Sequence, residues 1–250
     1  MPKYSLKLGN ISKFKVVGTS LLDVFFPRFC IGCKAVVQEE YLKFICQACV
    51  SSLNICSGTL CEICGAFLAE GLGQTCPCCQ NINPVFEESR SLFWMRGIAS
   101  NLIHTIKYHK GLFLLKDLGH ILSQYPNLIE FLSNSVLVPV PLHPLKELKR
   151  SFNQSYYIAK QIQQLAYNIS IHTVLKRVKY TSSQTTLGPD HRQRNVKNAF
   201  ALSPKVTIHS ALRYIIIDDV FTTGFTVNAC SQVLQMAGAK HIGVFTLGHS

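Results

Sequence analysis

The sequence has no long hydrophobic run. Although 48% of its 250 residues are hydrophobic, its apolar segments all fall short of the roughly 18 residues that a membrane-spanning helix needs. The apolar stretch 16–26 follows several lysines, as in a signal peptide, but Asp23 interrupts it and no small-residue cleavage site follows. We therefore expect a cytoplasmic protein in which residues 1–27 form an amphipathic lead-in helix.

Acidic residues are also scarce. The chain has 13 Asp and Glu against 25 Lys and Arg, for a net charge of +12. Residues 1–90 are nearly balanced, with 8 basic and 7 acidic side chains, whereas residues 91–250 hold 17 and 6. The excess gathers in two places, around Lys146, Lys149 and Arg150 and around Lys176, Arg177, Lys179, Arg192, Arg194 and Lys197. Such clusters suit a pyrophosphate, a nucleic-acid backbone, or simply a solvated face.

Cysteines are abundant in one segment. Ten of the 11 lie between residues 30 and 79, and Cys230 stands apart. Eight of them form four Cys-x-x-Cys pairs, which are Cys30 and Cys33, Cys46 and Cys49, Cys61 and Cys64, and Cys76 and Cys79. Spacers of twelve and eleven residues divide the pairs into two tetrads of the kind that hold structural Zn²⁺. Cys56 and Cys78 are left over, and Cys78 could replace a neighbour, so one or two zinc ions are expected.

Two other interpretations of these cysteines are weaker. A disulfide framework belongs to exported proteins, and nothing at the start of the chain directs export. A redox Cys-x-x-Cys pair would not come in four copies. We therefore expect an N-terminal zinc-ribbon segment.

The region near residue 220 carries the strongest sign of a ligand site. Residues 214–217 form an apolar β-type run that leads into Asp218 and Asp219, and residues 222–226 form a Thr/Gly loop. Helical spacing follows from Cys230 to Ala237, and residues 242–247 have the pattern of another strand. Ligands of parallel α/β sheets bind at the carboxyl ends of the strands, and helix N-termini favour anions. Paired carboxylates for a diol and a loop for a phosphate together indicate a ribose 5-phosphate, although an ordinary βαβ turn is the alternative.

The middle of the chain supplies further elements of an α/β fold. Residues 135–140 have the composition of a buried strand. Apolar residues at helical spacing predict three helices, through Ile98, Leu102, Ile103 and Ile106, through Leu114, Leu115, Leu118, Ile121 and Leu122, and through Ile158, Ile162 and Leu165. A parallel sheet flanked by helices is the architecture that fits this order of elements.

Several motifs together resemble one family. Residues 214–226 resemble the phosphoribosyl-diphosphate (PRPP) signature of type I phosphoribosyltransferases. The ComF competence-protein family is matched by KYHKG at 107–111, VPVPLH at 138–143, RSFNQ at 150–154, residues 184–187, and RNVKNAF at 194–200. Two residues depart from the family pattern, because Ser151 replaces a usual Gly and Phe225 replaces a usual small residue. The resemblance implies a zinc-ribbon segment at 28–85 and a type I phosphoribosyltransferase-like domain at 90–250.

The resemblance also implies roles for particular residues. Asp218 and Asp219 would hold the ribose of PRPP or its Mg²⁺ and stabilise an oxocarbenium-like transition state, and the loop would bind the 5′-phosphate through Thr222, Thr223, Gly224, Phe225 and Thr226. Residues 141–146 would be the pyrophosphate loop and residues 177–197 a mobile loop, with His143, Lys146, Arg192 and Arg194 as candidate pyrophosphate ligands. His143 is either a general acid or base or, more commonly, a hydrogen-bonding turn residue.

Three hypotheses about function follow. The ComF resemblance implies handling of incoming single-stranded DNA in natural transformation, together with a DNA-translocating ATPase, with Trp94, Tyr108, Phe152 and Tyr156 as candidate base-stacking residues. An active phosphoribosyltransferase with an unidentified acceptor is the alternative. A zinc-dependent adaptor without either activity is the third, because a fold does not fix a function.

Overall fold

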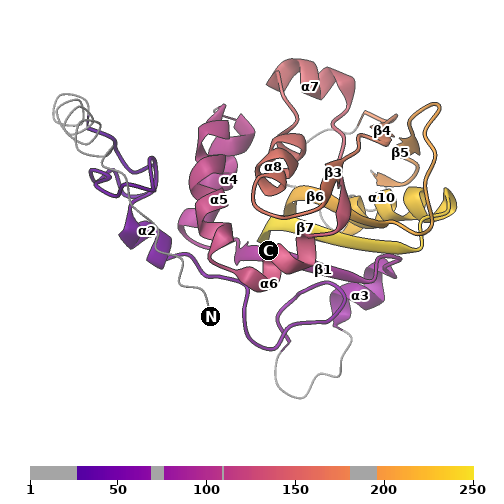
Figure 1. Ribbon diagram of the computed structural model, residues 1–250, viewed down its shortest axis with the longest axis horizontal. Coiled ribbons are helices and arrows are strands. Elements are labelled where there is room, and N and C mark those ends of the chain that lie inside the picture. The colour runs from indigo at the N-terminus through magenta and orange to yellow at the C-terminus, as the bar shows by residue number, and fades with distance from the viewer. Residues whose placement is uncertain (1–26, 69–75, 109, 181–195) are drawn as a thin grey trace, which may run out of the picture.

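A five-stranded parallel sheet forms the centre of the molecule (Figure 1). The computed structural model describes residues 27–68, 76–108, 110–180 and 196–250. The strands follow the spatial order β1 (Glu88–Trp94), β7 (His241–His249), β6 (Arg213–Phe221), β2 (Ser135–Pro139) and β3 (Ile169–Ile171). A separate antiparallel pair consists of β4 (Leu175–Arg177) and β5 (Phe200–Leu202). The predicted α/β class, with a parallel sheet, is confirmed.

Helices flank the sheet. The described helices are α2 (Gln47–Ser51), α3 (Pro77–Ile82), α4 (Ile98–Tyr108), α5 (Leu114–Ser123), α6 (Pro126–Leu132), α7 (Pro144–Arg150), α8 (Gln154–Gln163) and α10 (Phe225–Met236), with a 3-10 turn η1 (Gly111–Phe113) before α5. The three helices predicted from apolar spacing are α4, α5 and α8, although Leu165 lies beyond the end of α8. The lead-in helix predicted for residues 1–27 lies outside the described residues except for Pro27.

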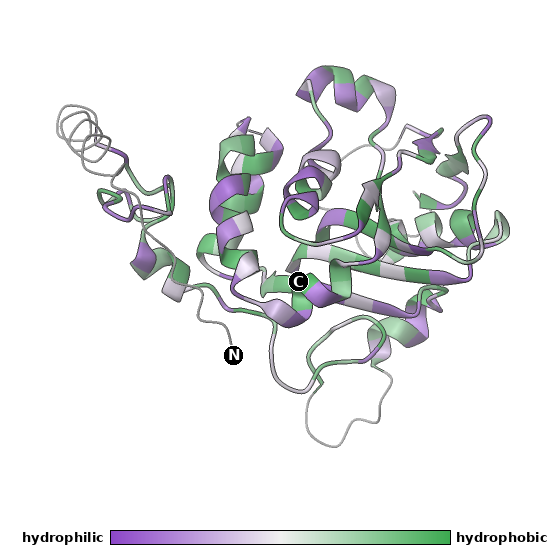
Figure 2. Cartoon of the chain, viewed as in Figure 1, coloured by the Kyte–Doolittle hydropathy of each residue, from purple (hydrophilic) through white to green (hydrophobic). Residues whose placement is uncertain are grey.

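Each face of the sheet is covered by its own hydrophobic core. Successive side chains of a strand point to opposite faces, so Ile215 and Ile217 of β6 join the first core while Tyr214 and Ile216 join the second. The first core includes residues of α4, α5 and α8 with Cys30, Cys46 and Cys49, whereas Cys33 is exposed. The second includes residues of α10, β4 and β5 with all four cysteines of the second tetrad. Figure 2 shows the apolar residues of the central strands between these layers. Both faces are buried, which explains the nearly continuous apolar runs of these strands.

The strands at the centre are longer than predicted. Parallel pairing of β6 with β7 continues past the two acids, with Asp218 opposite Thr246 and Phe221 opposite His249. Asp218 and Asp219 therefore lie within the paired part of β6 rather than beyond its end. The loop between β6 and α10 consists of residues 222–224 only. Helix α10 ends near Gly238, as the sequence predicts. Gly238 has a positive φ of 104°, a conformation that commonly terminates a helix.

The described helices include none that is both long and apolar enough to cross a membrane.

Candidate functional site

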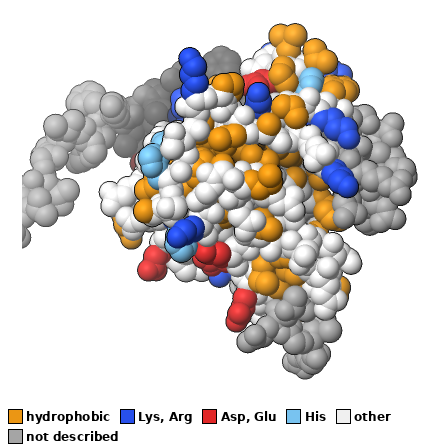
Figure 3. Space-filling model, turned by 90° about the vertical axis from the view of Figure 1, so that its right-hand side faces the viewer, with side chains coloured by type: hydrophobic (Ala, Val, Ile, Leu, Met, Phe, Trp, Pro, Cys, Tyr) orange, Lys and Arg blue, Asp and Glu red, His pale blue; other side chains and the backbone are white. Residues whose placement is uncertain are grey.

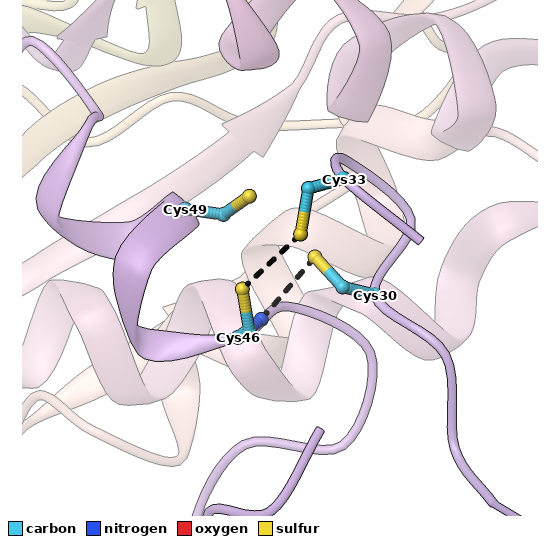
Figure 4. Close-up of side chains that lie close together, drawn as sticks. All are labelled: Cys30, Cys33, Cys46 and Cys49. Atoms are coloured by element: carbon cyan, nitrogen blue, oxygen red, sulfur yellow. Dashed lines mark hydrogen bonds between the residues drawn. The ribbon is translucent and has the colours of Figure 1, made fainter. Parts of the chain in front are cut away.

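The eight paired cysteines form two metal-binding groups, as the spacing predicts. Within each group all four sulfur atoms lie within 4.8 Å of one another. In the first tetrad, drawn in Figure 4, the sulfurs of Cys33 and Cys46 are 3.5 Å apart. In the second, those of Cys64 and Cys76 are 3.2 Å apart. Cys56 and Cys78 belong to neither group within the described residues. Four convergent thiols at this separation fit the tetrahedral S₄ shell of a structural Zn²⁺.

The backbone around each tetrad favours thiolate ligands. Burial opposes ionisation of Cys30, but backbone N–H groups of Cys33, Cys46 and Gly32 outweigh it and lower the pKa of the Cys30 thiol to about 7. Burial is likewise outweighed at Cys61, whose pKa falls to about 6 because of the N–H groups of Cys64, Cys76 and Ile63. Zinc binds thiolates, so these N–H groups prepare one cysteine of each tetrad for the metal.

Asp218 and Asp219 are brought together with two residues from distant segments. The Lys107 Nζ, at the end of α4, lies 3.0 Å from Asp219 Oδ1. The Ser155 hydroxyl, at the start of α8, donates to Asp218 Oδ1 at 3.0 Å. Asp219 is 4% exposed, and its Oδ2 has no hydrogen-bond partner among the described residues. The pair is therefore held in place on one side and has an unused carboxylate oxygen on the other.

The charges in this pair are not equivalent. Burial raises the pKa of Asp218 to about 7, the negative charge of Asp219 adds to this, and Lys107 opposes it. Burial by itself would lower the pKa of Lys107, but the charge and hydrogen bond of Asp219 raise it overall. Lys107 is thus a fixed cation paired with Asp219, while Asp218 can change its protonation near neutral pH.

The RSFNQ motif connects the acid pair to the neighbouring strand. Asn153 accepts from the N–H of Ser155 at 3.1 Å as the N-cap of α8, and its Nδ2 donates to the carbonyl of Val140 at 3.0 Å, just after β2. Ser151 has a φ of +67°, a conformation that suits glycine, which explains the family's usual Gly at this position. The motif therefore fixes the start of α8, and with it the Ser155 hydroxyl.

Three cations converge beside the acids. Burial lowers the pKa of Lys146, and the nearby charges of Arg177 and Arg150 lower it further. Burial also lowers the pKa of Arg177, partly offset by the charges of Cys230 and Asp218. Among the described residues, Lys146 and Arg150 form no ion pair with a carboxylate. Neighbouring cations that repel one another are typical of a polyanion site.

His143 lies at the start of α7 in the predicted pyrophosphate loop. Its Nδ1 accepts from the N–H of Leu145 at 3.3 Å, and its ring meets that of Tyr180 edge-on at 5.1 Å. These contacts are those of the turn residue that was the alternative to an acid or base. Arg192 and Arg194, the other two candidate pyrophosphate ligands, lie outside the described residues.

The Thr/Gly loop has the geometry of an open turn before a helix. Gly224 is the N-cap of α10 with a φ of +74°, and no side chain caps the helix. The hydroxyls of Thr222, Thr223 and Thr226 make no hydrogen bond to any described residue. Because the first N–H groups of a helix also lack partners within it, this turn offers several donors for an anion.

Phe225, the departure from the family pattern, packs toward the second core. Its side chain lines a groove of about 840 Å³ between α10, the β5 strand and Ile82. Figure 3 shows hydrophobic side chains gathered on the side of the molecule that carries α10 and β5. Phe225 therefore serves as a hydrophobic anchor at the start of α10.

Sequence reasoning missed the partners of the acid pair. Lys107 belongs to the KYHKG motif but was given no role, and Ser155 was not considered. Their contacts with residues 219 and 218 join segments that are far apart in the chain. The only signal was that each lies in or directly after a motif of the family resemblance.

The chain is similar to known proteins over most of its length. A family model described as a double zinc ribbon domain matches residues 21–80. Competence protein F of Haemophilus influenzae is 26% identical over 230 residues, covering 90% of this chain and 99% of that protein. DNA utilization protein YhgH of Escherichia coli is 28% identical over 230 residues, covering 88% and 96%. Competence protein ComFC of Bacillus subtilis is 22% identical over 215 residues, covering 81% and 83%.

Two solved phosphoribosyltransferases are among the structures similar to this chain. A hypoxanthine phosphoribosyltransferase from Staphylococcus aureus matches with a TM-score of 0.33 and 14% identity, over 54% of this chain and 65% of that one. A purine phosphoribosyltransferase from Pyrococcus horikoshii matches with a TM-score of 0.29 and 12% identity, over 55% and 83%. The sequence relatives confirm the resemblance to the ComF family, and the chain is a homologue of competence protein F, ComFC and YhgH that carries a double zinc ribbon.

Proposed function

We propose that this protein binds PRPP with Mg²⁺ at the carboxyl edge of its sheet and handles single-stranded DNA. The observation that carries the first part is the meeting of an acid pair, three cations and an uncapped Thr/Gly turn at one edge. PRPP needs these three features, since it has a diol, a pyrophosphate and a 5′-phosphate. The names of the relatives motivate the second part.

Each part of PRPP has candidate partners in this arrangement. The hydroxyls and backbone N–H groups of residues 222–226 would bind the 5′-phosphate. Lys146, Arg150 and Arg177 would face the pyrophosphate, where their mutual repulsion would be relieved. Asp218 and Asp219 would orient the ribose hydroxyls, and the ion pair with Lys107 would hold Asp219 in position.

The acid pair also fits Mg²⁺. The buried Oδ2 of Asp219 lacks a partner among the described residues, and carboxylate oxygens are the hard ligands that Mg²⁺ prefers. When bound with PRPP, the metal would neutralise charge on the pyrophosphate and ribose oxygens. Asp218 and Asp219 would hold it, and Ser155 would keep Asp218 in position.

Isothermal titration with PRPP and Mg²⁺ tests this proposal. We expect saturable binding to the unchanged protein and at least a tenfold loss of affinity in a variant with Asp218→Asn and Asp219→Asn. Glu147→Gln is the matched control, because Glu147 is an exposed carboxylate on α7 near the cations. No heat of binding to the zinc-loaded protein would refute the PRPP part of the proposal.

A surface of paired aromatic and basic side chains supports binding of single-stranded DNA. The Arg150 guanidinium lies 5.0 Å from the centre of the Tyr108 ring, and Lys160 Nζ lies 5.3 Å from that of Tyr156. Tyr108 is 50% exposed, so its ring is open to a base. Exposed rings beside cations are what single strands bind, through stacking and phosphate contacts.

Three of the four candidate stacking residues are less suited to this role. Phe152 is buried, with 8% of its surface exposed. Trp94 is half-buried and packs edge-on against the His249 ring at 5.1 Å. Tyr156 is also half-buried and meets the Tyr157 ring edge-on at 5.7 Å, so Tyr108 remains as the main proposed stacking residue.

Fluorescence anisotropy with a labelled oligonucleotide at several salt concentrations tests DNA binding. We expect affinity to fall steeply with salt, and a combined Tyr108→Ala and Arg150→Ala variant to bind about tenfold more weakly. Lys240→Ala, at the opposite edge of the sheet before β7, controls for net charge. An affinity that does not respond to salt would exclude this part of the proposal.

Phosphoribosyl transfer is the alternative function for the same site. The acid pair beside a PRPP site would stabilise an oxocarbenium-like transition state. Turnover of PRPP with a nucleobase or amine, lost in the Asp218→Asn and Asp219→Asn variant, would favour it over binding alone.

A further inference from the structure

The second cysteine tetrad lies against the Thr/Gly loop of the candidate site. We propose that this second zinc ribbon holds the sugar-phosphate site in its binding geometry, and that Asn228 is the positioning residue that joins the ribbon to the site. Zinc bound to Cys61, Cys64, Cys76 and Cys79 would fix α3, and α3 would fix the loop and the start of α10. The proposal deepens the proposed function and rests on it where PRPP is the ligand.

Asn228 uses its whole side-chain amide to link α10 to α3. Its Nδ2 donates to the carbonyl of Ile82 at 2.8 Å, and its Oδ1 accepts from the N–H of Val85 at 3.0 Å. Asn228 is 4% exposed, so water cannot readily replace these bonds. Ile82 follows the zinc ligand Cys79 by three residues on the same short helix. The amide therefore connects the zinc-bound helix to the first turn of α10.

The backbone of Asn228 reaches the loop itself. Its N–H donates to the carbonyl of Gly224 at 2.9 Å. One residue thus contacts both the end of the ribbon helix and the glycine at the centre of the anion-binding turn. A shift of α3 would be passed directly to Gly224.

Packing at Gly224 adds a second link. A Cβ atom placed on Gly224 would lie 2.7 Å from Cδ1 of Ile82 and 2.8 Å from Cζ of Phe221. The loop therefore passes against the ribbon helix so closely that only glycine fits. One turn earlier on the same face of α3, the Cys78 sulfur lies 3.9 Å from the carbonyl oxygen of Thr223, which is a weak contact.

The end of the sheet forms a third link. Nε2 of His249 lies 3.1 Å from the carbonyl oxygen of Cys64, and the His249 ring stacks on Phe221 at 4.9 Å. Phe221 is the residue that supports Gly224. Both halves of the second tetrad, through Cys64 and through Cys79, are thus connected to the same loop.

Thermodynamic reciprocity gives the proposal a sharp test. If zinc in the second tetrad and a ligand on the loop stabilise one arrangement, each must strengthen the binding of the other by the same factor. We expect saturating PRPP with Mg²⁺ to weaken competition by a chelator for zinc in the second tetrad by about fivefold or more, the lower range of such couplings. Alkylation of released thiols, located by mass spectrometry, identifies which tetrad has lost its metal.

The variants separate positioning from general stability. We expect Asn228→Ala and the isosteric Asn228→Asp to lose most of this mutual protection while they still bind two zinc ions per chain. Hydrogen exchange measured without ligand should speed up at residue 228, whose N–H is bonded to the Gly224 carbonyl of the loop, and remain unchanged at residues 43–46, in the first ribbon. Gln232→Ala is the control, because Gln232 is exposed one turn further along α10 and lines the same groove.

The outcomes distinguish this proposal from the proposed function. If the unchanged protein does not bind PRPP, the proposed function fails, and hydrogen exchange in the Asn228 variants still decides the link between ribbon and loop. Unchanged exchange at residue 228 in both Asn228 variants would overturn the link. Equal protection of both tetrads by PRPP would overturn it as well, because Asn228 and His249 connect the second tetrad to the loop.

Discussion

The two cysteine tetrads have almost the same spacing but different surroundings. The first belongs to the hydrophobic core on the α4 and α5 side of the sheet, and the second to the core on the α10 side. A buried carboxylate anchors the first, because Asp117 of α5 accepts from the N–H groups of Lys43, Phe44 and Ile45 at 2.7 to 3.0 Å. The second is attached to elements of the candidate site through Asn228 and His249.

This difference shows that ligand spacing does not determine what a zinc ribbon does. Both tetrads have the same chemistry and a similar preference for thiolates. What differs is the part of the fold that each stabilises. The first ribbon secures the segment at residues 41–50 against α5, whereas the second supports the loop at residues 222–226. Variants on the two sides should therefore have different effects on stability and on ligand binding.

The largest effect is expected from the anchor of the first ribbon. Asp117 is fully buried, so Asp117→Ala leaves three backbone N–H groups without an acceptor, at about 1–3 kcal/mol each. We expect a loss of at least about 3 kcal/mol in the free energy of unfolding or local release of the first ribbon. Urea unfolding together with hydrogen exchange at residues 43–45 measures this.

The same variant tests how separate the two ribbons are. PRPP affinity should stay within about twofold of the unchanged protein wherever the variant is folded, since Asp117 has no contact with the loop among the described residues. Glu130→Gln, which changes an exposed carboxylate of α6, is the control. A large loss of PRPP affinity in folded Asp117→Ala protein would contradict the comparison.

The residues that give the two ribbons their different surroundings were the hardest to predict from the sequence. Cysteine pairs and apolar periodicity are local patterns, so both tetrads, the strand at residues 214–217 and helices α4 and α5 could be predicted from the sequence. Asp117 lies within an apolar helix pattern, and its partners are more than 70 residues away. Lys107 and Asp219 are also joined only by folding. Nothing local marks such pairs, because they depend on which face of the sheet each segment covers.

The order of the strands could not be predicted from the sequence for the same reason, because no local pattern marks which strands become neighbours. β1 and β7 are neighbours although almost the whole sheet domain separates them in the chain. β3 has only three residues, too few for a periodic signal. The predicted end of the strand at the acids was too early for a related reason, because pairing with β7 continues through Phe221. Sequence identified the acids and the loop, but only the sheet brings Lys107 and Ser155 to them.

The protonation of Asp218 should make the stability of the candidate site depend on pH. Its folded pKa of about 7 lies above the ordinary value of 3.8, mainly because of burial. The stability associated with the neutral form is fully present below about pH 4 and is lost as pH rises through 7. The Asp218→Asn variant does not lose this stability as pH rises, because an amide side chain does not ionise. We expect the variant to gain about 3 kcal/mol relative to the unchanged protein between pH 4.5 and pH 8.

Urea unfolding of both proteins at the two pH values measures this difference, and the comparison between proteins cancels other groups that titrate in the range. A difference between Asp218→Asn and the unchanged protein that is the same at both pH values would show that Asp218 is ionised throughout.

The smallest effect is expected at His249, which links the second ribbon to the end of the sheet. A carbonyl oxygen can only accept, so Nε2 of His249 must carry the proton in its 3.1 Å contact with Cys64. His249→Phe keeps a ring that can stack on Phe221 but loses this hydrogen bond. The cost should be about 1 kcal/mol, seen as faster loss of zinc from the second tetrad to a chelator.

A matched variant near the first ribbon allows the effects on zinc release to be compared. His120 stacks on Tyr41 at 5.6 Å between α5 and the first ribbon, so His120→Phe changes a similar ring contact there. We expect it to leave zinc release from the second tetrad unchanged. If the two variants affect both tetrads alike, the ribbons act as one unit. Their different attachments, to Asp117 on one side and to His249 and Asn228 on the other, would then carry no functional distinction.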